Sequence, residues 1–337
     1  MALTRLTDIV QPAVFLQYSK EYTPEKLDLL NSVAFGNPLP QIAPQMAAGG
    51  SIIDMPFWQD TSRVEPNLQT DDDTVLSTPL KIGATQMTAR KLYWHQSWSQ
   101  ADLAGAFATG NTKDPLKQIT DYTENYWRRI MQITAIKVCD GILADNVAND
   151  AADMRYLIYS DIASPAAANK ISPAAVNRTR VTMGEMMNDL GVIVMHSKVY
   201  TDALDQEAIT FIPPSKLPFQ IAMFAGMQVV VSDDCTVVAG VNSPKYRSYM
   251  FGPAALHKEV HYPEVAVETF RNPDKGNGGG VETLHNRRHA LIHANGFRFT
   301  SASVAGKSPA WSELQTAANW DRKYQRKNIK IAYLETN

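Results

Sequence analysis

The sequence has little of what marks a metal centre, a disulfide scaffold or a membrane span. Its two cysteines, Cys139 and Cys235, lie far apart and outside any CxxC pair, so we expect buried free thiols. No run of roughly 18 apolar residues occurs, and Pro12 interrupts the short apolar patch near the beginning. The sequence therefore predicts neither a membrane span nor a signal peptide, and favours a protein kept in the cytoplasm or in an assembly built there.

An excess of charge of one sign is also lacking. The sequence has 34 acidic and 32 basic residues, which leaves a formal net charge of -2. A dedicated nucleic-acid binder needs a strong basic field, so tight and unaided wrapping of DNA is excluded, although weaker contact is not. The 337 residues are 45% apolar and 20% charged, which is ordinary for folded domains and indicates about two of them.

Catalytic signatures are absent as well. The chain has no GxSxG elbow, HExxH motif or kinase signature. The glycine-rich stretch 276–280 is followed by a strand pattern, whereas a phosphate loop needs a helix N-terminus there. Gly306-Lys307-Ser308 ends like a Walker A motif, but Ser301 replaces the leading glycine and Pro309 follows. We therefore expect no catalytic residues and no cofactor.

Two groups of side chains consist of residue types that bind metal ions. Histidines recur at four-residue spacing, which on a helix makes a metal-binding face; they are His257, His261, His285, His289 and His293. Their surroundings alternate like strands, and no carboxylate or cysteine cluster completes a ligand set. The acidic run 71–73 offers oxygen ligands for a hard cation, but a solvated loop tip explains it better. The sequence predicts no metal site.

The stretch 190–234 carries the strongest folding signal. Two β-branched apolar runs, 192–195 and 227–231, have the length of buried strands. Between them, Lys198 to Leu204 indicates a short helix with Tyr200 and Leu204 on one face. In isolation this α/β unit resembles the centre of a small catalytic domain, with Asp233 and Asp234 after its second strand. We interpret these aspartates as a strand end.

The flanking segments extend outward from that unit. Residues 1–50 predict an arm, with a helix start at Thr23-Pro24 and proline-rich sequence after Gly36. Residues 51–58 and 80–98 predict the strands of a long hairpin, whose polar middle cannot fold alone. From Leu116 to Asn146 a helix of about 45 Å is predicted, with Gly141 as a weak point.

The remaining segments complete an α+β pattern. We expect a helix over 176–190, strands over 236–241 and 246–251, and helical structure over 309–325. Residues 264–270 and 281–299 predict a second hairpin with a glycine-rich tip. Residues 328–334 predict a terminal strand that joins the middle sheet. Exposed hairpins of this kind invite pairing with other chains, so the pattern indicates a closed assembly of many copies.

This order of parts resembles the major capsid proteins of tailed bacteriophages, which have the HK97-like fold. The resemblance covers nearly the whole chain and is strongest in MHSKVYTDAL (195–204), GMQVVVSDD (226–234), ETFRNPDKGNGG (268–279) and the ending from Ala318 to Asn337. It implies an N-terminal arm over 1–50 and an extended loop over 51–98. A peripheral domain then spans 99–149 and 259–303, with a spine helix over 114–147, and an axial domain spans 150–258 and 304–337.

The resemblance also implies a function and partners. Such proteins form hexamers and pentamers that tile an icosahedral shell around double-stranded DNA, so we expect a virion protein assembled in the host bacterial cytoplasm. No long helical segment precedes the arm, which implies a separate scaffolding protein or a removed segment, with portal and decoration proteins as further partners. Lys81 is the lysine nearest the loop tip, but nothing supports a covalent cross-link. The alternatives are an encapsulin-type nanocompartment shell and, from another class, a cytoplasmic α/β enzyme.

Overall fold

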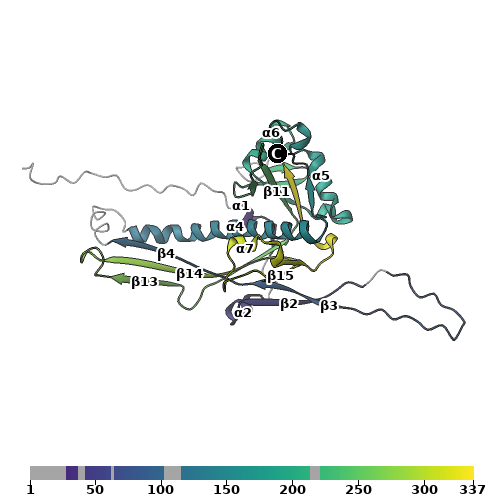
Figure 1. Ribbon diagram of the computed structural model, residues 1–337, viewed down its shortest axis with the longest axis horizontal. Helices are drawn as coiled ribbons and strands as arrows, with labels where there is room; N and C mark the ends of the chain where they lie inside the picture. The colour runs from purple at the N-terminus through teal and green to yellow at the C-terminus, as the bar shows by residue number, and fades with distance from the viewer. Residues whose placement is uncertain (1–27, 37–41, 62–63, 102–114, 213–220) are drawn as a thin grey trace, which may run out of the picture.

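The computed structural model of the protein describes residues 28–36, 42–61, 64–101, 115–212 and 221–337, without the side chains of 115–121 and 212. The predicted helix start at Thr23-Pro24 lies outside these residues. Figure 1 shows an elongated molecule with a compact α/β part above one end of the long helix α4 (Pro115–Asn149). A sheet lies beneath α4, and the segment between β2 (Ile52–Trp58) and β3 (Ala84–Arg90) projects far from the rest.

The compact part is built on a mixed sheet in the order β5-β17-β11-β6-β9-β8-β7, with β10 also paired to β11. Its strands are β5 (Arg155–Leu157), β6 (Val192–Met195), β7 (Ile209–Ile212), β8 (Ile221–Phe224), β9 (Met227–Val231), β10 (Val237–Val238), β11 (Lys245–Phe251) and β17 (Ile331–Thr336). The two strands predicted at 192–195 and 227–231 are confirmed and pair in parallel. The terminal strand is confirmed too, and it lies inside the sheet between β5 and β11.

Two hydrophobic cores cover the two faces of this sheet. On one face, residues of α5 (Pro173–Val181) and α6 (Ser197–Asp205) pack against alternate strand residues such as Ile193 and Met250. On the other face, α4 packs against the intervening residues, among them Val192 and Phe251. The buried face of α6 is formed by Val199 and Ala203, whereas the predicted Leu204 is 38% exposed.

The sheet beneath α4 has five strands. β14 (Val281–Ala294) is central: β4 (Leu92–Ala101) pairs along one side, and β12 (Leu256–His261) and β13 (Val267–Asn272) pair along the other. β1 (Phe35–Gly36), which follows the short helix α1 (Asp28–Asn31), extends the sheet beyond β12. The predicted late hairpin is confirmed as β13 and β14, and its tip uses positive φ at Gly276, Gly278 and Gly280.

The strand predicted over 80–98 is wrong as one element, because it divides at Lys91. β3 pairs with β2, whereas β4 pairs with β14 in another sheet. The Lys91 side chain is buried at this crossing, where its ammonium donates to the carbonyl oxygens of Met46 and Ala48 in and after α2 (Ile42–Ala47). The tertiary contacts of Lys91 therefore divide a segment whose sequence pattern predicts one continuous strand.

Three other predicted elements are shorter than expected. The helix over 176–190 ends at Val181, since Gly184 takes a left-handed φ of 60° and a 3-10 helix, η3 (Gly184–Asp189), follows. The strand over 236–241 contains only β10. The strand over 281–299 divides at Gly296, whose φ is 90°, into β14 and β15 (Phe297–Phe299).

The segment 309–325 is not one helix. It forms α7 (Trp311–Leu314), a short 3-10 turn and β16 (Trp320–Arg322), which pairs with β15. The Trp320 indole N–H donates to the carbonyl oxygen of Leu314 at 2.7 Å, and this bond folds the chain back against α4. Gly141 of α4 lies at the same place and is no weak point: the helix continues through it, and a Cβ there would lie 1.9 Å from the Leu314 oxygen.

Candidate assembly surfaces

Of the extended loop predicted over 51–98, the part between β2 and β3 is residues 59–83, and from here on the name extended loop refers to this part. Every side chain from 59 to 82 that the structure describes, which leaves out 62–63, is exposed. A hydrogen bond from the Gln59 amide to the Gly83 carbonyl closes its base at 2.8 Å, and Asn67 reaches the Thr78 carbonyl at 3.1 Å. Its apolar side chains have no core of their own; they are Val64 (55% exposed), Leu68 (79%), Val75 (59%), Leu76 (85%), Leu80 (60%) and Ile82 (61%).

The root of the extended loop is, by contrast, firmly packed. Ile53 and Met55 of β2 and Met87 of β3 form a buried cluster with α2 and with Leu291 of β14. The Tyr93 hydroxyl donates to the Gly50 carbonyl at 3.0 Å, and Phe57 packs edge-on against Tyr324 with ring centroids 4.8 Å apart. A packed root that carries exposed apolar side chains is typical of an element that binds the surface of another molecule.

The acidic run lies at the tip of this loop. Asp72 accepts hydrogen bonds from the Thr74 amide at 2.9 Å and from the Thr74 hydroxyl at 2.6 Å, and these bonds lower the pKa of its carboxyl. Asp71 and Asp73 are exposed beside it. The solvated tip expected from the sequence is therefore what the structure shows. Lys81 lies two residues from Gly83 at the base, not at the tip.

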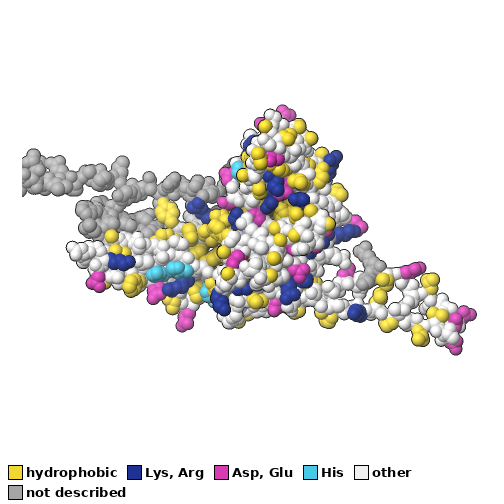
Figure 2. Space-filling view, viewed as in Figure 1, with side chains coloured by type: hydrophobic (Ala, Val, Ile, Leu, Met, Phe, Trp, Pro, Cys, Tyr) yellow, Lys and Arg dark blue, Asp and Glu magenta, His cyan; other side chains and the backbone are white. Residues whose placement is uncertain are grey.

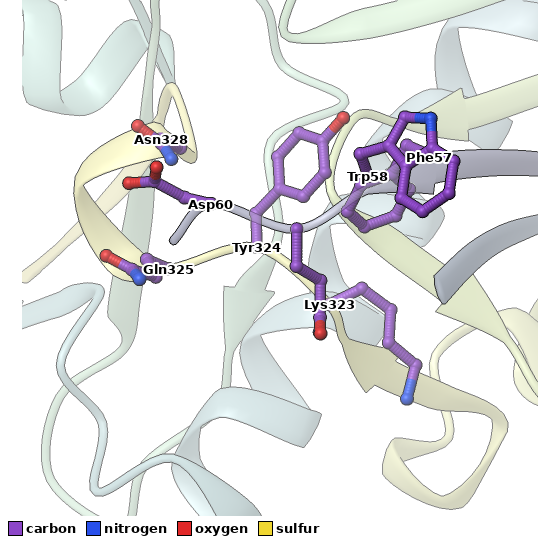
Figure 3. Close-up of a pocket in the computed structure, with 8 residues that line it drawn as sticks. Phe57, Trp58, Asp60, Lys323, Tyr324, Gln325 and Asn328 are labelled. Atoms are coloured by element: carbon purple, nitrogen blue, oxygen red, sulfur yellow. The ribbon is translucent and has the colours of Figure 1, made fainter. Parts of the chain in front are cut away.

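A hollow of about 610 Å³ opens beside the root of the loop. Figure 3 shows Phe57 and Trp58 on one side, Asp60 near Gln325 and Asn328 on the other, and Tyr324 between them. Trp58 is 74% exposed, which is unusual for so large an apolar side chain. The hollow is an open surface feature of the loop root, and none of its lining residues belongs to the α/β unit over 190–234.

The histidines that recur at four-residue spacing lie on strands, as the alternation predicts. Since residues two apart share a face, His285, His289 and His293 of β14 all point to one side of the sheet. Each faces a histidine of a neighbouring strand rather than its own sequence neighbours. Within the described residues, no group of three or more histidine, cysteine, aspartate or glutamate side chains is placed to hold a metal ion.

The two aspartates that follow β9, Asp233 and Asp234, connect the end of this strand to two helices. Asp233 accepts a hydrogen bond from the Ser197 amide at the start of α6 at 3.2 Å, and Asp234 accepts one from the Gln132 amide group of α4 at 2.7 Å. They terminate a strand and tie it to two helices, as the sequence interpretation holds. Cys139 and Cys235 are free and buried, as predicted, and burial raises the pKa of both thiols.

The two glycine-bearing motifs also have structural roles. Residues 276–280 connect β13 to β14 without a following helix. In the other motif, Arg90 donates to the carbonyl oxygens of Gly306 and Lys307 at 3.1 and 3.0 Å, and the Ser308 hydroxyl accepts from the Tyr93 amide. These hydrogen bonds hold the segment 306–308 against Arg90 and Tyr93, near the root of the extended loop.

Sequence reasoning missed a buried ionic network between α4 and the mixed sheet. Arg247 of β11 pairs with Asp140 of α4, and its Nη2 lies 2.9 Å from Oε1 of Glu335 on β17. The Tyr249 hydroxyl donates to Asp140 at 2.8 Å, and Lys245 pairs with Glu335 at 3.2 Å. The sequence does not show which of these residues pair, because the partners lie more than 80 positions apart. It does show charged residues inside predicted core strands, and buried charges require partners.

Known proteins resemble this chain in sequence and in fold. Residues 106–330 match the family model described as Major capsid protein 13-like. The major capsid protein of Bacillus phage SPP1 is 32% identical over 334 residues, which cover 98% of this chain and 97% of that protein.

Two solved structures illustrate the similarity in fold. The capsid of Ralstonia phage GP4 has a TM-score of 0.55 at 11% identity, covering 99% of this chain and 98% of that one. The capsid of cyanophage Pam1 has a TM-score of 0.56 at 10% identity, covering 98% of both. At such identities the likeness concerns the fold alone, which is the HK97-like fold of phage capsids.

Proposed function

Because the chain belongs to the family of major capsid proteins described as Major capsid protein 13-like, we propose how its parts divide the work of building a shell. The chain is a structural protein of a tailed phage, located in the head shell of the virion, and is not an enzyme. The HK97-like α+β fold expected from the sequence is confirmed. The encapsulin alternative loses its basis, since the identity to a phage major capsid protein runs nearly end to end.

The observation that carries the proposal is the extended loop. Six apolar side chains on it are more than half exposed, and the loop projects away from every other described part (Figure 1). Burying them against a second copy would remove apolar surface from water, at roughly 25 cal/mol per Å² before the costs of association. We propose that each loop lies on a neighbouring subunit, and that the copies form hexamers and pentamers which close an icosahedral shell.

The remaining parts take complementary roles in this proposal. The described part of the predicted arm (1–50) packs on its own subunit, where Leu29 and Leu30 join one core and Ile42 another. The peripheral domain (99–149 and 259–303) supports the loop, and the axial domain (150–258 and 304–337) surrounds the capsomer axis. Because β4 pairs with β14 and β3 does not, we place the end of the extended-loop unit at Lys91 rather than at 98. Many weak contacts shared over these parts add up in a closed shell.

The proposed partners follow from the same role. A shell of this kind encloses double-stranded DNA, and a net charge of -2 fits non-specific contact at its inner face better than tight binding. Scaffolding, portal and decoration proteins are the further partners we propose. Within the described residues, no helix is both long and apolar enough to cross a membrane.

Deleting residues 60–78 tests the proposal. We expect the shortened chain to keep its circular dichroism spectrum, because the loop contributes nothing to the buried cores, and to form no stable shells in negative-stain micrographs. Leu68→Ala, which removes an apolar side chain that is 79% exposed, should weaken shells, whereas Gln69→Ala beside it should not. Normal shells from the shortened chain would refute the role of the loop.

A further inference from the structure

The sheet beneath α4 concentrates histidine on one face. The chain has seven histidines, and the strand register places six of them on the same side of this sheet, while His196 caps α6 elsewhere. The six are His95 of β4, His257 and His261 of β12, and His285, His289 and His293 of β14. Neither α4 nor its aromatic contacts lie on this side: α4 reaches the opposite face, where Trp127 donates to Asn286.

The six histidines form three cross-strand pairs. His95 Nε2 lies 3.0 Å from His285 Nδ1, with the rings stacked at 5.3 Å. His261 and His289 are directly opposite in the register, with ring centroids 6.1 Å apart. His257 and His293 are opposite as well, but both are buried. The first two pairs are open to solvent, and we name His95, His261, His285 and His289 the histidine face.

The arginine on the same side of the sheet as the histidine face already has a carboxylate partner, so the histidines themselves would contact a carboxylate from another subunit. Arg287 of β14 and Glu268 of β13 pair with each other at 2.8 Å. The other titratable groups that face the histidines are Tyr93 of β4, whose ring packs edge-on against His289, Glu259 of β12 and the buried Lys91 before β4. Burial and the nearby His261 and Lys91 lower the pKa of His289.

The extended loop carries the complementary charge. Residues 59–83 contain five acidic and two basic residues, and three of the carboxylates stand together at the tip as Asp71, Asp72 and Asp73. Figure 2 shows the acidic tip at the far right end of the molecule and the histidines of the sheet left of the compact part, so the tip does not rest on the histidine face of its own subunit. Phe270 lies on the same side of the sheet and is 58% exposed, and it offers an apolar contact for Leu76 of the loop.

We infer that the histidine face receives the acidic tip of the extended loop from a second copy of the chain, and that this contact tightens when the imidazoles take up protons. The inference rests on the proposed function, in which loops lie on neighbours, and it adds the surface and its regulation. Carboxylates placed beside the histidines favour their charged form. The docked state therefore binds more protons than the free one.

The direction of the pH dependence follows from that difference. A histidine whose pKa rises on docking strengthens the contact fully below its free pKa, and the gain is lost as the pH rises through the docked pKa. One histidine shifted by about one pKa unit changes the affinity about tenfold. The contact should hold most strongly near pH 6 and weaken toward pH 8, while burial of apolar side chains continues to contribute at either pH.

Disulfide trapping tests the location. In assembled shells, the pair Asp72→Cys with His285→Cys should join subunits into ladders on a non-reducing gel; the native thiols do not interfere because both are buried. The control pairs Asp72→Cys with Thr269→Cys, which lies on the opposite face of the same sheet and should give no ladder. Shells without a ladder in the first pair, or with one in the control, would overturn the docking site alone. Failure of the native chain to form shells would instead overturn the proposed function.

Histidine replacement tests the regulation. We expect subunit release from native shells, followed by light scattering in a fixed concentration of urea, to be at least about tenfold slower at pH 6 than at pH 8. The triple variant His95→Gln, His285→Gln, His289→Gln should show less than about a twofold difference, and so should Asp71→Asn, Asp72→Asn, Asp73→Asn. His196→Gln, which removes the histidine outside the sheet, should keep the native ratio. An equal pH dependence in all four proteins would overturn the protonation-linked contact.

Discussion

Arg247 and Asp140 form a buried ion pair that joins β11 of the mixed sheet to the long helix α4. The same guanidinium contacts Glu335 of β17, and the Arg155 guanidinium reaches Glu335 from β5. These groups lie where the proposed axial and peripheral domains meet. The Arg247 guanidinium therefore ties α4 to the mixed sheet at this boundary, while Lys245 and Arg155 give Glu335 two further cations within the sheet.

Replacing Arg247 should be among the most damaging single changes in the core. Arg247→Met keeps much of the side-chain volume but leaves Asp140 and Glu335, 5% and 0% exposed, without their shared cation. Removing one partner of a buried pair costs about 3–5 kcal/mol, and urea unfolding of the unassembled subunit measures it. Lys327→Ala, which breaks an exposed pair with Glu185, should cost less than about 1 kcal/mol. Similar costs for both variants would contradict the role of the buried network.

Gly141 should tolerate no side chain, although alanine is the better helix former by about 1 kcal/mol. A Cβ at Gly141 would lie 1.9 Å from the Leu314 carbonyl oxygen and 2.3 Å from the Trp320 indole nitrogen, and would push both apart. We expect Gly141→Ala to lower the thermal midpoint by many degrees and to expose Trp320, which its fluorescence reports. Gly191→Ala is the matched control, because nothing lies within 4 Å of its Cβ position. A more stable Gly141→Ala variant would show that this packing is wrong.

Asp145 near the end of α4 should make the subunit less stable as the pH rises. Burial raises the pKa of its carboxyl to about 6, and among the described residues its Oδ2 has no hydrogen-bond partner. The folded state thus holds a proton that the unfolded chain releases near pH 3.8, so stability is highest below that pH and falls until about pH 6.

Asp145→Asn should remove this penalty. It keeps an acceptor for the Asn149 amide group, which now donates to Asp145 at 2.7 Å. The variant should match the native subunit near pH 4 and exceed it by up to about 3 kcal/mol at pH 7, in denaturant unfolding at each pH. A constant difference at all pH values would mean that Asp145 does not titrate as described.

Lys91 should fix the root of the extended loop. Its ammonium donates to the carbonyls of Met46 and Ala48, at 3.3 and 2.6 Å, and burial lowers its pKa. Lys91→Met leaves those carbonyls unsatisfied, at a cost of about 1–3 kcal/mol. Hydrogen exchange should then speed up in 42–48 and 84–90 and stay unchanged in β6 and β9. If hydrogen exchange in 42–48 and 84–90 stayed unchanged, the apolar cluster alone would keep the root rigid, and the role given to Lys91 would be wrong.

Sequence pattern predicted the parts whose structure is decided locally. The two β-branched runs at 192–195 and 227–231 became β6 and β9, and the long apolar period from Leu116 became α4. In each case buried apolar side chains repeat with the period of the element itself. The extended loop was also foreseeable, since its polar sequence lacks material for a core.

Tertiary contacts decided what pattern could not show. Lys91 and Gly296 end strands whose alternation continues past them, and Trp320 bends a segment with helical spacing back against α4. The histidine face is the clearest case. The spacing of four is visible in the sequence, but its meaning depends on which strands pair with β14 and in what register.

Negative-stain electron microscopy of the purified protein, with and without a scaffolding partner, tests the central claim most directly. A shell protein whose loops lie on its neighbours should appear as rings or closed shells, and light scattering should report particles far larger than the 37.3 kDa chain. A strictly monomeric species at high concentration under both conditions would contradict the account.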